Sequence, residues 1–237
     1  MLSSAATISK AEDDALYAPF ETLLASSVVD GNVDYPAFAV SNAFASLVTD
    51  LETARPPADS QAARLAFYIN AYNVMAIQGI LDGYSPSSIW SRLRFFKRRK
   101  YDLFGTSMSL YELEHERIIA EGDPRIHFAI VCASKSCPPL RSALYTAADL
   151  DAELDDVTRR FINTPGSNDF DAQINVATVS RIFKWYRDEF KDEAGSLQRY
   201  LASYVEDASL RESLMTEDWS IEFHDYDWSL NGTPLPR

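Results

Sequence analysis

Cysteine and histidine are scarce in this chain, whose 237 residues include two cysteines and three histidines. Two cysteines are too few for the disulfide framework of a small secreted domain or for a four-cysteine zinc site. Cys132 and Cys137 lie only five positions apart. Their number and spacing leave the redox compartment open.

The chain also lacks long apolar runs and an excess of basic residues. It has 22 Lys and Arg against 35 Asp and Glu, a formal net charge of -13, which repels phosphate backbones and anionic lipid head groups. No run of about 18 apolar residues could span a membrane. Residues 1–10 show neither the basic nor the apolar region of a signal peptide. We therefore expect no nucleic-acid partner and no membrane span, with the cytoplasm as the default location and a mature exported form as the alternative.

One short stretch departs from this acidic character. Six cations fall within nine positions: Arg92, Arg94, Lys97, Arg98, Arg99 and Lys100. One interpretation is a solvated basic loop leading into a strand. The alternative is a docking patch for an acidic partner or the mouth of an anion site.

Hydrophobic periodicity predicts a mostly helical chain. Residues 11–27 and 36–54 read as amphipathic helices joined by a turn at 30–32, and a proline-containing linker at 55–60 ends the second helix. Apolar residues then occur on nearly every face from about 61 to 82, which predicts a helix buried all round. Further helices are expected at 146–163, 178–191, 195–206 and 207–215.

The expected strands are short. A hairpin is predicted at 100–109, and strands at 125–132, 170–176 and 220–228. We expect an α+β fold, a mostly helical single domain over 1–237 around a small, largely antiparallel sheet. Its core spans about 17–231, and 1–10 and 232–237 are expected to be flexible.

A capping box at Ser109 and Glu112 predicts a helix from residue 110. Placed at about 100° per residue, Glu114 and His115 fall within the apolar arc of this helix. Buried polar groups need partners, so these two side chains either form part of a site or clamp neighbouring backbone.

His127 begins the expected strand that ends at Cys132, and the alternation of that strand places the two side chains on opposite faces. For Cys137 to meet His127, the loop would have to double back almost fully. His115, on another element, has no such limit. Cys132 is expected to pack as an inert small hydrophobe.

Cys137 is the candidate nucleophile. It lies in a small polar loop, with Pro138 immediately after it and Lys135 and Arg141 on either side. Cations, a histidine and backbone N–H groups lower the pKa of a thiol, which is what nucleophilic catalysis requires. The alternative is a buried loop thiol without chemistry.

Two asparagines stand one turn apart in the buried helix, at Asn70 and Asn73. Buried amides need hydrogen-bonding partners. We expect them to bond strand or loop backbone, including the loop that bears Cys137, more than to act in catalysis.

Several sequence blocks together resemble the family known as domain of unknown function 547. They are residues 65–73, 109–115, 123–141, 183–186 and the closing 226–231. The resemblance runs from about Tyr17 to Asn231, and it implies no established activity. The buried helix and a histidine-bearing strand are also similar to papain-like and transglutaminase-like thiol enzymes, which place the nucleophilic cysteine at the start of the central helix. Here that helix carries the two asparagines instead.

These observations support three hypotheses. The first is a thiol hydrolase or transferase acting on a small molecule or peptide, with Cys137 as nucleophile, His115 or His127 as base and Glu114 orienting the imidazole; no cofactor is expected. Asn70, Asn73, Arg125 and Arg141 would support this site. The second is a non-catalytic binding or scaffold module in which the same residues are structural. The third is a metal site at His115, His127 and Cys137, for which no recognisable ligand spacing exists.

Overall fold

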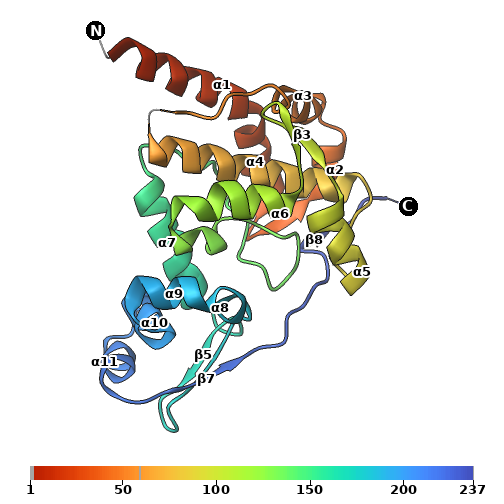
Figure 1. The fold of residues 1–237 in the computed structure, drawn as a ribbon. Helices are drawn as coiled ribbons and strands as arrows, with labels where there is room; N and C mark the ends of the chain where they lie inside the picture. The colour runs from red at the N-terminus through yellow and green to blue at the C-terminus, as the bar shows by residue number, and fades with distance from the viewer. Residues whose placement is uncertain (1–2, 59, 237) are drawn as a thin grey trace. The chain divides into compact units, whose positions relative to one another are not determined.

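A computed structural model describes residues 3–58 and 60–236 of the chain, with side chains from residue 15 onward (Figure 1). The chain forms two compact units, one of Met1–Glu153 with Trp228–Arg237 and one of Leu154–Asp227. Helices and small separate sheets confirm the α+β class. The single domain expected over 1–237 stays a prediction, as do its flexible ends. Of those ends, 1–2 and 237 lie outside the described residues, while 3–10 belong to a helix.

The first unit is built around helix α4 (Gln61–Leu81), which begins where the Ser60 side chain accepts the Ala63 N–H. Every residue from 65 to 77 is buried, which confirms the helix expected to be covered on all sides. The α-helices that pack against α4 are α1 (Ser3–Ser27), α2 (Tyr35–Ala39), α3 (Asn42–Asp50) and α6 (Leu110–Leu113). In Figure 1, α4 runs between α1 and α6.

The helix expected at 36–54 is interrupted. It forms α2 and α3, because Ser41 takes an extended conformation and caps α3 by accepting the Phe44 N–H. Before α2, strands β1 (Val28–Val29) and β2 (Asn32–Asp34) pair antiparallel, and β8 (Gly232–Thr233) adds to β2 in parallel. This small sheet therefore joins the C-terminal segment to the N-terminal part of the first unit.

The hairpin expected at 100–109 is present. It pairs β3 (Tyr101–Leu103) with β4 (Thr106–Met108), and its turn residues Phe104 and Gly105 both have positive φ. The helix α5 (Ile89–Arg92) and the π-helix η1 (Leu93–Arg98) precede the hairpin.

The helix from residue 110 differs in part from the prediction. The capping box of Ser109 and Glu112 is confirmed, but α6 passes into a π-helix η2 (Glu114–Ile118) and a 3-10 turn η3 (Ile119–Glu121). Glu114 is buried, whereas His115 is exposed, so the expectation that both point inward was wrong. Leu113 is buried and lies roughly 160° from His115 on a helical wheel, which turns the apolar arc away from the imidazole.

The strand expected at 125–132 was also wrong. Residues Pro124–Phe128 form the 3-10 helix η4, whose start is fixed by the Asp123 side chain accepting the Arg125 N–H at 2.9 Å. Residues 129–133 follow as an irregular segment that belongs to no strand: Ala129 still has helical dihedral angles, and Ala133 has φ +58°. The Ile, Val and Phe content reflected burial rather than strand pairing.

The boundary of the second unit falls within α7 (Leu150–Ile162). The strand expected at 170–176 is instead a hairpin of β5 (Asp169–Asp171) and β6 (Val176–Val179), and β7 (Ser220–Phe223) pairs with β6 in parallel. The remaining helices are α8 (Ile182–Trp185), α9 (Arg187–Ala194), α10 (Leu197–Tyr204) and α11 (Ala208–Thr216). No helix in the described part of the chain has the length and apolar character needed to cross a bilayer.

Candidate functional site

The two buried asparagines of α4 hold two distant segments of the chain. Asn73 donates to the Ala129 carbonyl at 3.0 Å, and its own oxygen accepts the Val131 N–H at 2.9 Å. Asn70 binds the backbone of a single residue. Its amide N–H donates to the Tyr145 carbonyl at 2.8 Å, and its oxygen accepts the Tyr145 N–H at 3.0 Å. All four bonds are buried, so the amides take the backbone-binding role that the sequence predicted for them.

These asparagines close a loop that carries both cysteines. We call residues 129–145 the thiol loop. Both of its ends are hydrogen-bonded to α4, at positions about one helical turn apart. Within it, the Cys137 N–H donates to the Ser134 carbonyl at 3.1 Å and makes a tight turn. The chain therefore doubles back, and the Cys132 N–H donates to Cys137 Sγ at 2.9 Å.

Both sulfur atoms lie in a polar setting. Cys132 and Cys137 are partly exposed thiols that no disulfide joins. Cys132 Sγ lies 2.9 Å from Ser134 Oγ, so the expectation that Cys132 packs as an inert hydrophobe does not describe it. Burial, and then the charges that Cys132 and Cys137 can carry, raise the pKa of Tyr35. The Tyr35 hydroxyl is thus neutral and within electrostatic reach of both thiols.

The C-terminal segment supports the other side of the thiol loop. The Lys135 N–H donates to the Ser229 carbonyl at 2.9 Å, and the Asn231 N–H donates to the Ala133 carbonyl at 3.3 Å. Ala133 has φ +58°, a conformation that costs a non-glycine residue roughly 1–2 kcal/mol. Tyr35 donates to Asn231 Oδ1 at 2.6 Å, which connects this segment to α2.

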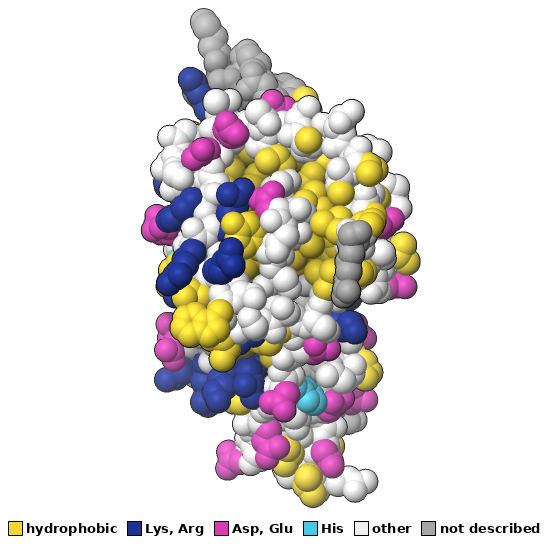
Figure 2. Space-filling view, turned by 90° about the vertical axis from the view of Figure 1, so that its right-hand side faces the viewer, with side chains coloured by type: hydrophobic (Ala, Val, Ile, Leu, Met, Phe, Trp, Pro, Cys, Tyr) yellow, Lys and Arg dark blue, Asp and Glu magenta, His cyan; other side chains and the backbone are white. Residues whose placement is uncertain are grey.

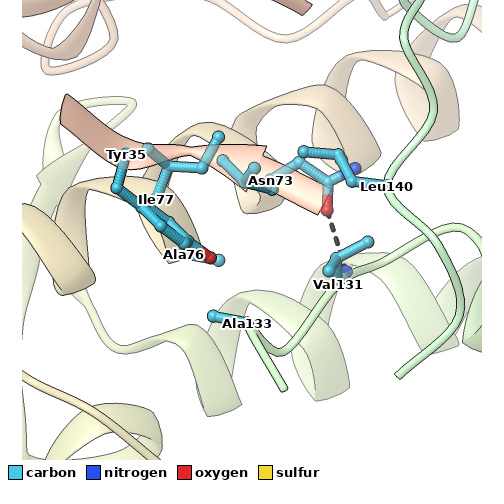
Figure 3. A pocket seen from close by; sticks show the side chains of 8 residues that line it. Tyr35, Asn73, Ala76, Ile77, Val131, Ala133 and Leu140 are labelled. Carbon is cyan, nitrogen blue, oxygen red and sulfur yellow. Dashed lines mark hydrogen bonds between the residues drawn. The ribbon is translucent and has the colours of Figure 1, made fainter. Parts of the chain in front are cut away.

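A small cavity lies beneath the thiol loop (Figure 3). Its volume of about 10 Å³ is roughly the room that one water needs. The Tyr35 ring and the Asn73 amide are both part of its wall, together with apolar side chains: Val33, Ala76, Ile77, Val131, Ala133 and Leu140. This space is too small for an organic substrate, and neither cysteine lines it.

The remaining predicted catalytic residues have different surroundings. His127 is buried in η4, and Glu114 is buried in η2, which packs against α4. Exposed His115 stacks on the Tyr111 ring at 3.8 Å, and its Nδ1 lies 3.0 Å from the Tyr111 carbonyl. Because His127 lies in a helix and not in a strand, the alternation argument that separated it from the cysteines no longer applies.

The two predicted supporting arginines bind carboxylates. Arg125 forms ion pairs of 2.8 Å with Asp123 and with Asp151. Arg141 pairs with Glu153 at 3.1 Å and donates to the Leu144 carbonyl at 3.0 Å. Both positive charges are therefore compensated locally, which weakens the expectation that Arg141 stabilises a thiolate.

Some residues that shape the site were missed by sequence reasoning. Tyr35 carries no motif, and Gly31 was predicted only as part of the turn at 30–32. Asn231 closes the last of the blocks that resemble a known family, and that block could have indicated it. Within the described residues, no cluster of three or more His, Cys, Asp or Glu side chains could hold a metal ion.

Comparison with known proteins gives one family. Residues 58–162 match the family "Protein of unknown function, DUF547". This region is a DUF547 domain. It contains the cysteines, His115, His127 and both asparagines of α4, whereas the DUF547 match leaves out Tyr35 and the C-terminal segment that contact the thiol loop. No curated protein and no solved structure matches the chain.

Proposed function

We propose that this protein is a thiol-dependent acyl hydrolase or transferase with Cys137 as its nucleophile. The observation that carries the proposal is the Cys132 N–H donating to Cys137 Sγ at 2.9 Å. A hydrogen bond to the charged form favours that form, so this donor lowers the pKa of the Cys137 thiol. Cys137 is a partly exposed residue, as a nucleophile that meets a substrate has to be.

His127 is the general base in this proposal, and Glu114 orients its imidazole. Both are buried, and His127 belongs to the segment that leads directly into the thiol loop. Exposed His115 is not part of the proposed machinery. In known thiol hydrolases an imidazole oriented by a carboxylate activates the nucleophile, and the proposal assigns these two roles to His127 and Glu114.

The reaction proceeds through a thioester. The His127 imidazole takes the Cys137 proton, the sulfur bonds to the acyl carbon, and the bond from that carbon to the leaving group breaks. The imidazolium returns the proton to the leaving group. Water, or an alcohol or thiol acceptor, then attacks the thioester and releases the acyl group as acid or transferred product, which restores the Cys137 thiol.

The rigidity of the thiol loop also supports the proposal. Its ends are bonded to Asn70 and Asn73, and its centre is bonded to Ser229 and Asn231. A nucleophile held on a fixed loop loses little entropy when it reacts. The positive φ of Ala133 is strain of the kind that concentrates at functional sites.

The alternative is a non-catalytic scaffold, and one group of contacts favours it. Asn70, Asn73 and Arg125 all bond backbone or carboxylates in ways that a structural role explains completely. In that case Cys137→Ala leaves partner binding intact, and Glu114→Ala destabilises the fold.

An esterase and thioesterase assay separates the two functions. The purified protein is incubated with p-nitrophenyl acetate and with an acyl thioester, and the acyl-enzyme is sought by intact mass. Cys137→Ser and His127→Ala are expected to reduce turnover by about 10²-fold or more. Cys132→Ala, which keeps the donating backbone N–H, and His115→Ala are the matched controls and keep most of the activity.

Melting temperature decides how a loss is interpreted. A large loss in Cys137→Ser without a change in melting temperature supports catalysis. The catalytic proposal is wrong if the wild type forms no acyl-enzyme with either substrate, or if Cys137→Ser retains the full rate.

A further inference from the structure

The six cations at 92–100 do not form one uniform patch. Arg92 lies over the Trp228 ring at 4.4 Å, and Lys97 lies over the Tyr111 ring at 4.1 Å. Neither Arg92 nor Lys97 lines the hollow that the other four cations form. The face in Figure 2 shows Lys and Arg side chains gathered beside hydrophobic ones.

The other four cations line a hollow of about 290 Å³ with Tyr84 as its aromatic wall: Arg94, Arg98, Arg99 and Lys100. Two of the four are already compensated. Arg99 forms an ion pair of 2.7 Å with Asp82, and Lys100 pairs with Glu112. The positive field in the hollow thus comes mainly from the remaining two arginines.

Arg94 and Arg98 are exposed and have no carboxylate partner among the residues that the structure describes. They stand four positions apart in the π-helix η1. π-Helices are rare in proteins, and those that occur often lie at functional sites. Arg94 lies over the Tyr84 ring at 5.4 Å, which holds its guanidinium in place without neutralising it. Two exposed like charges four positions apart repel each other weakly, and an anion bound between them would remove this repulsion.

We propose that this hollow is a binding site for a phosphate or diphosphate group of a small molecule. The guanidinium fork matches the geometry of phosphate oxygens, and two uncompensated arginines match the charge of one phosphate dianion. The volume suits a phosphate or diphosphate with part of its substituent. A nucleic-acid chain is disfavoured because the protein carries a formal net charge of -13.

The test uses the full chain and inorganic pyrophosphate as the probe. Isothermal titration calorimetry at low salt measures its affinity for the wild type and for Arg94→Ala and Arg98→Ala. Each variant is expected to bind about 10-fold or more weakly, since each loses charge-assisted hydrogen bonds. The matched controls are Lys97→Ala and Arg92→Ala, which remove one charge from the same segment outside the hollow and are expected to change the affinity less than about 3-fold.

A nucleoside diphosphate and a sugar phosphate, titrated in parallel, identify the source of the group. If either compound binds more tightly than pyrophosphate, its nucleoside or sugar is also recognised. If both bind as tightly as pyrophosphate, the phosphate alone is recognised. The proposal is overturned if pyrophosphate does not bind, or if Lys97→Ala weakens it as much as Arg98→Ala does. The latter result would mean that pyrophosphate responds to the overall positive charge of the segment and not to a defined binding site. Circular dichroism of each variant confirms that it folds.

Discussion

Gly31 lies directly against Pro139, so a Cβ atom at Gly31 would come within 2.5 Å of the Pro139 Cβ and 2.8 Å of its Cα. Gly31 also has φ +77°, a conformation that favours glycine. Pro139 follows Cys137 by two residues, so this approach fixes where the thiol loop sits on the turn between β1 and β2.

Gly31→Ala is therefore expected to destabilise the protein more than the strain of positive φ alone would. Gly105→Ala is the matched control, since Gly105 has φ +75° and open space around it. We expect about 1–2 kcal/mol for Gly105→Ala and at least about 1 kcal/mol more for Gly31→Ala, measured by urea unfolding. Equal losses would show that Pro139 moves away without cost.

Asn73→Ala is expected to destabilise the fold by about 2–4 kcal/mol. It leaves the Ala129 carbonyl and the Val131 N–H buried without their amide partner. Asn70→Ala leaves the N–H and the carbonyl of Tyr145 without their amide partner, so it should reduce the free energy of unfolding by a similar amount.

The two asparagine variants should differ in the reactivity of Cys137. Asn73 holds the residue next to Cys132, whereas Asn70 holds the far end of the thiol loop. We expect the rate of Cys137 alkylation to change several-fold in Asn73→Ala and by less than about twofold in Asn70→Ala. An unchanged rate in both variants would refute the role of Asn73 in positioning the thiols.

Tyr35 and Asn231 provide a test of the connection to the C-terminal segment. Because the Tyr35 hydroxyl donates to Asn231 Oδ1 at 2.6 Å in a buried setting, Tyr35→Phe should cost about 1–2 kcal/mol. A double-mutant cycle with Asn231→Ala should give a coupling free energy of about 1 kcal/mol. Strict additivity in urea unfolding would mean that the hydrogen bond contributes nothing.

The capping carboxylate Glu112 makes part of the stability depend on pH. The Lys100 ammonium, and then the Ser109 N–H and hydroxyl, lower the pKa of Glu112 to about 2. Because this folded-state pKa lies below the unfolded value near 4.5, the interaction stabilises the fold above about pH 4.5 and is lost as the pH falls toward 2.

Glu112→Gln keeps the shape of the cap and removes its charge. Since the carboxylate is partly exposed, we expect a loss of only about 1 kcal/mol at pH 7. Urea unfolding at pH 7 and pH 3 measures the difference between wild type and variant, which should fall to less than half at the lower pH. A difference that is the same at both values would contradict the assigned pKa.

The parts of the fold that the sequence predicts well depend on local signals. Three local signals specify their elements by themselves: the apolar residues on nearly every face of 61–81, the capping box at Ser109 and the glycine turn at 105. The segment at 125–132 could not be predicted this way. Its apolar residues would be buried in either a strand or a helix. The Asp123 cap, together with the bond from Val131 to Asn73, 58 positions away, favours η4 and an irregular segment after it.

The same distinction holds for the site. The asparagines were identified because amides in an apolar helix need partners, a rule that requires no knowledge of the fold. His115 was misplaced because the single residue Leu113 turns the arc of its helix. Tyr35 and Gly31 reach the thiol loop from across the chain, and contacts over such separations leave no local pattern in the sequence.

The central claim is that the Cys132 N–H activates Cys137. The second-order rate of Cys137 alkylation by iodoacetamide, measured from pH 5 to 10 in the Cys132→Ala variant, tests it most directly, because this variant keeps the backbone donor and leaves a single thiol. We predict a midpoint at least about one pH unit below the usual thiol value near 8.5, which returns to 8.5 in urea. A folded protein whose Cys137 titrates at or above 8.5, or does not react, would contradict the claim.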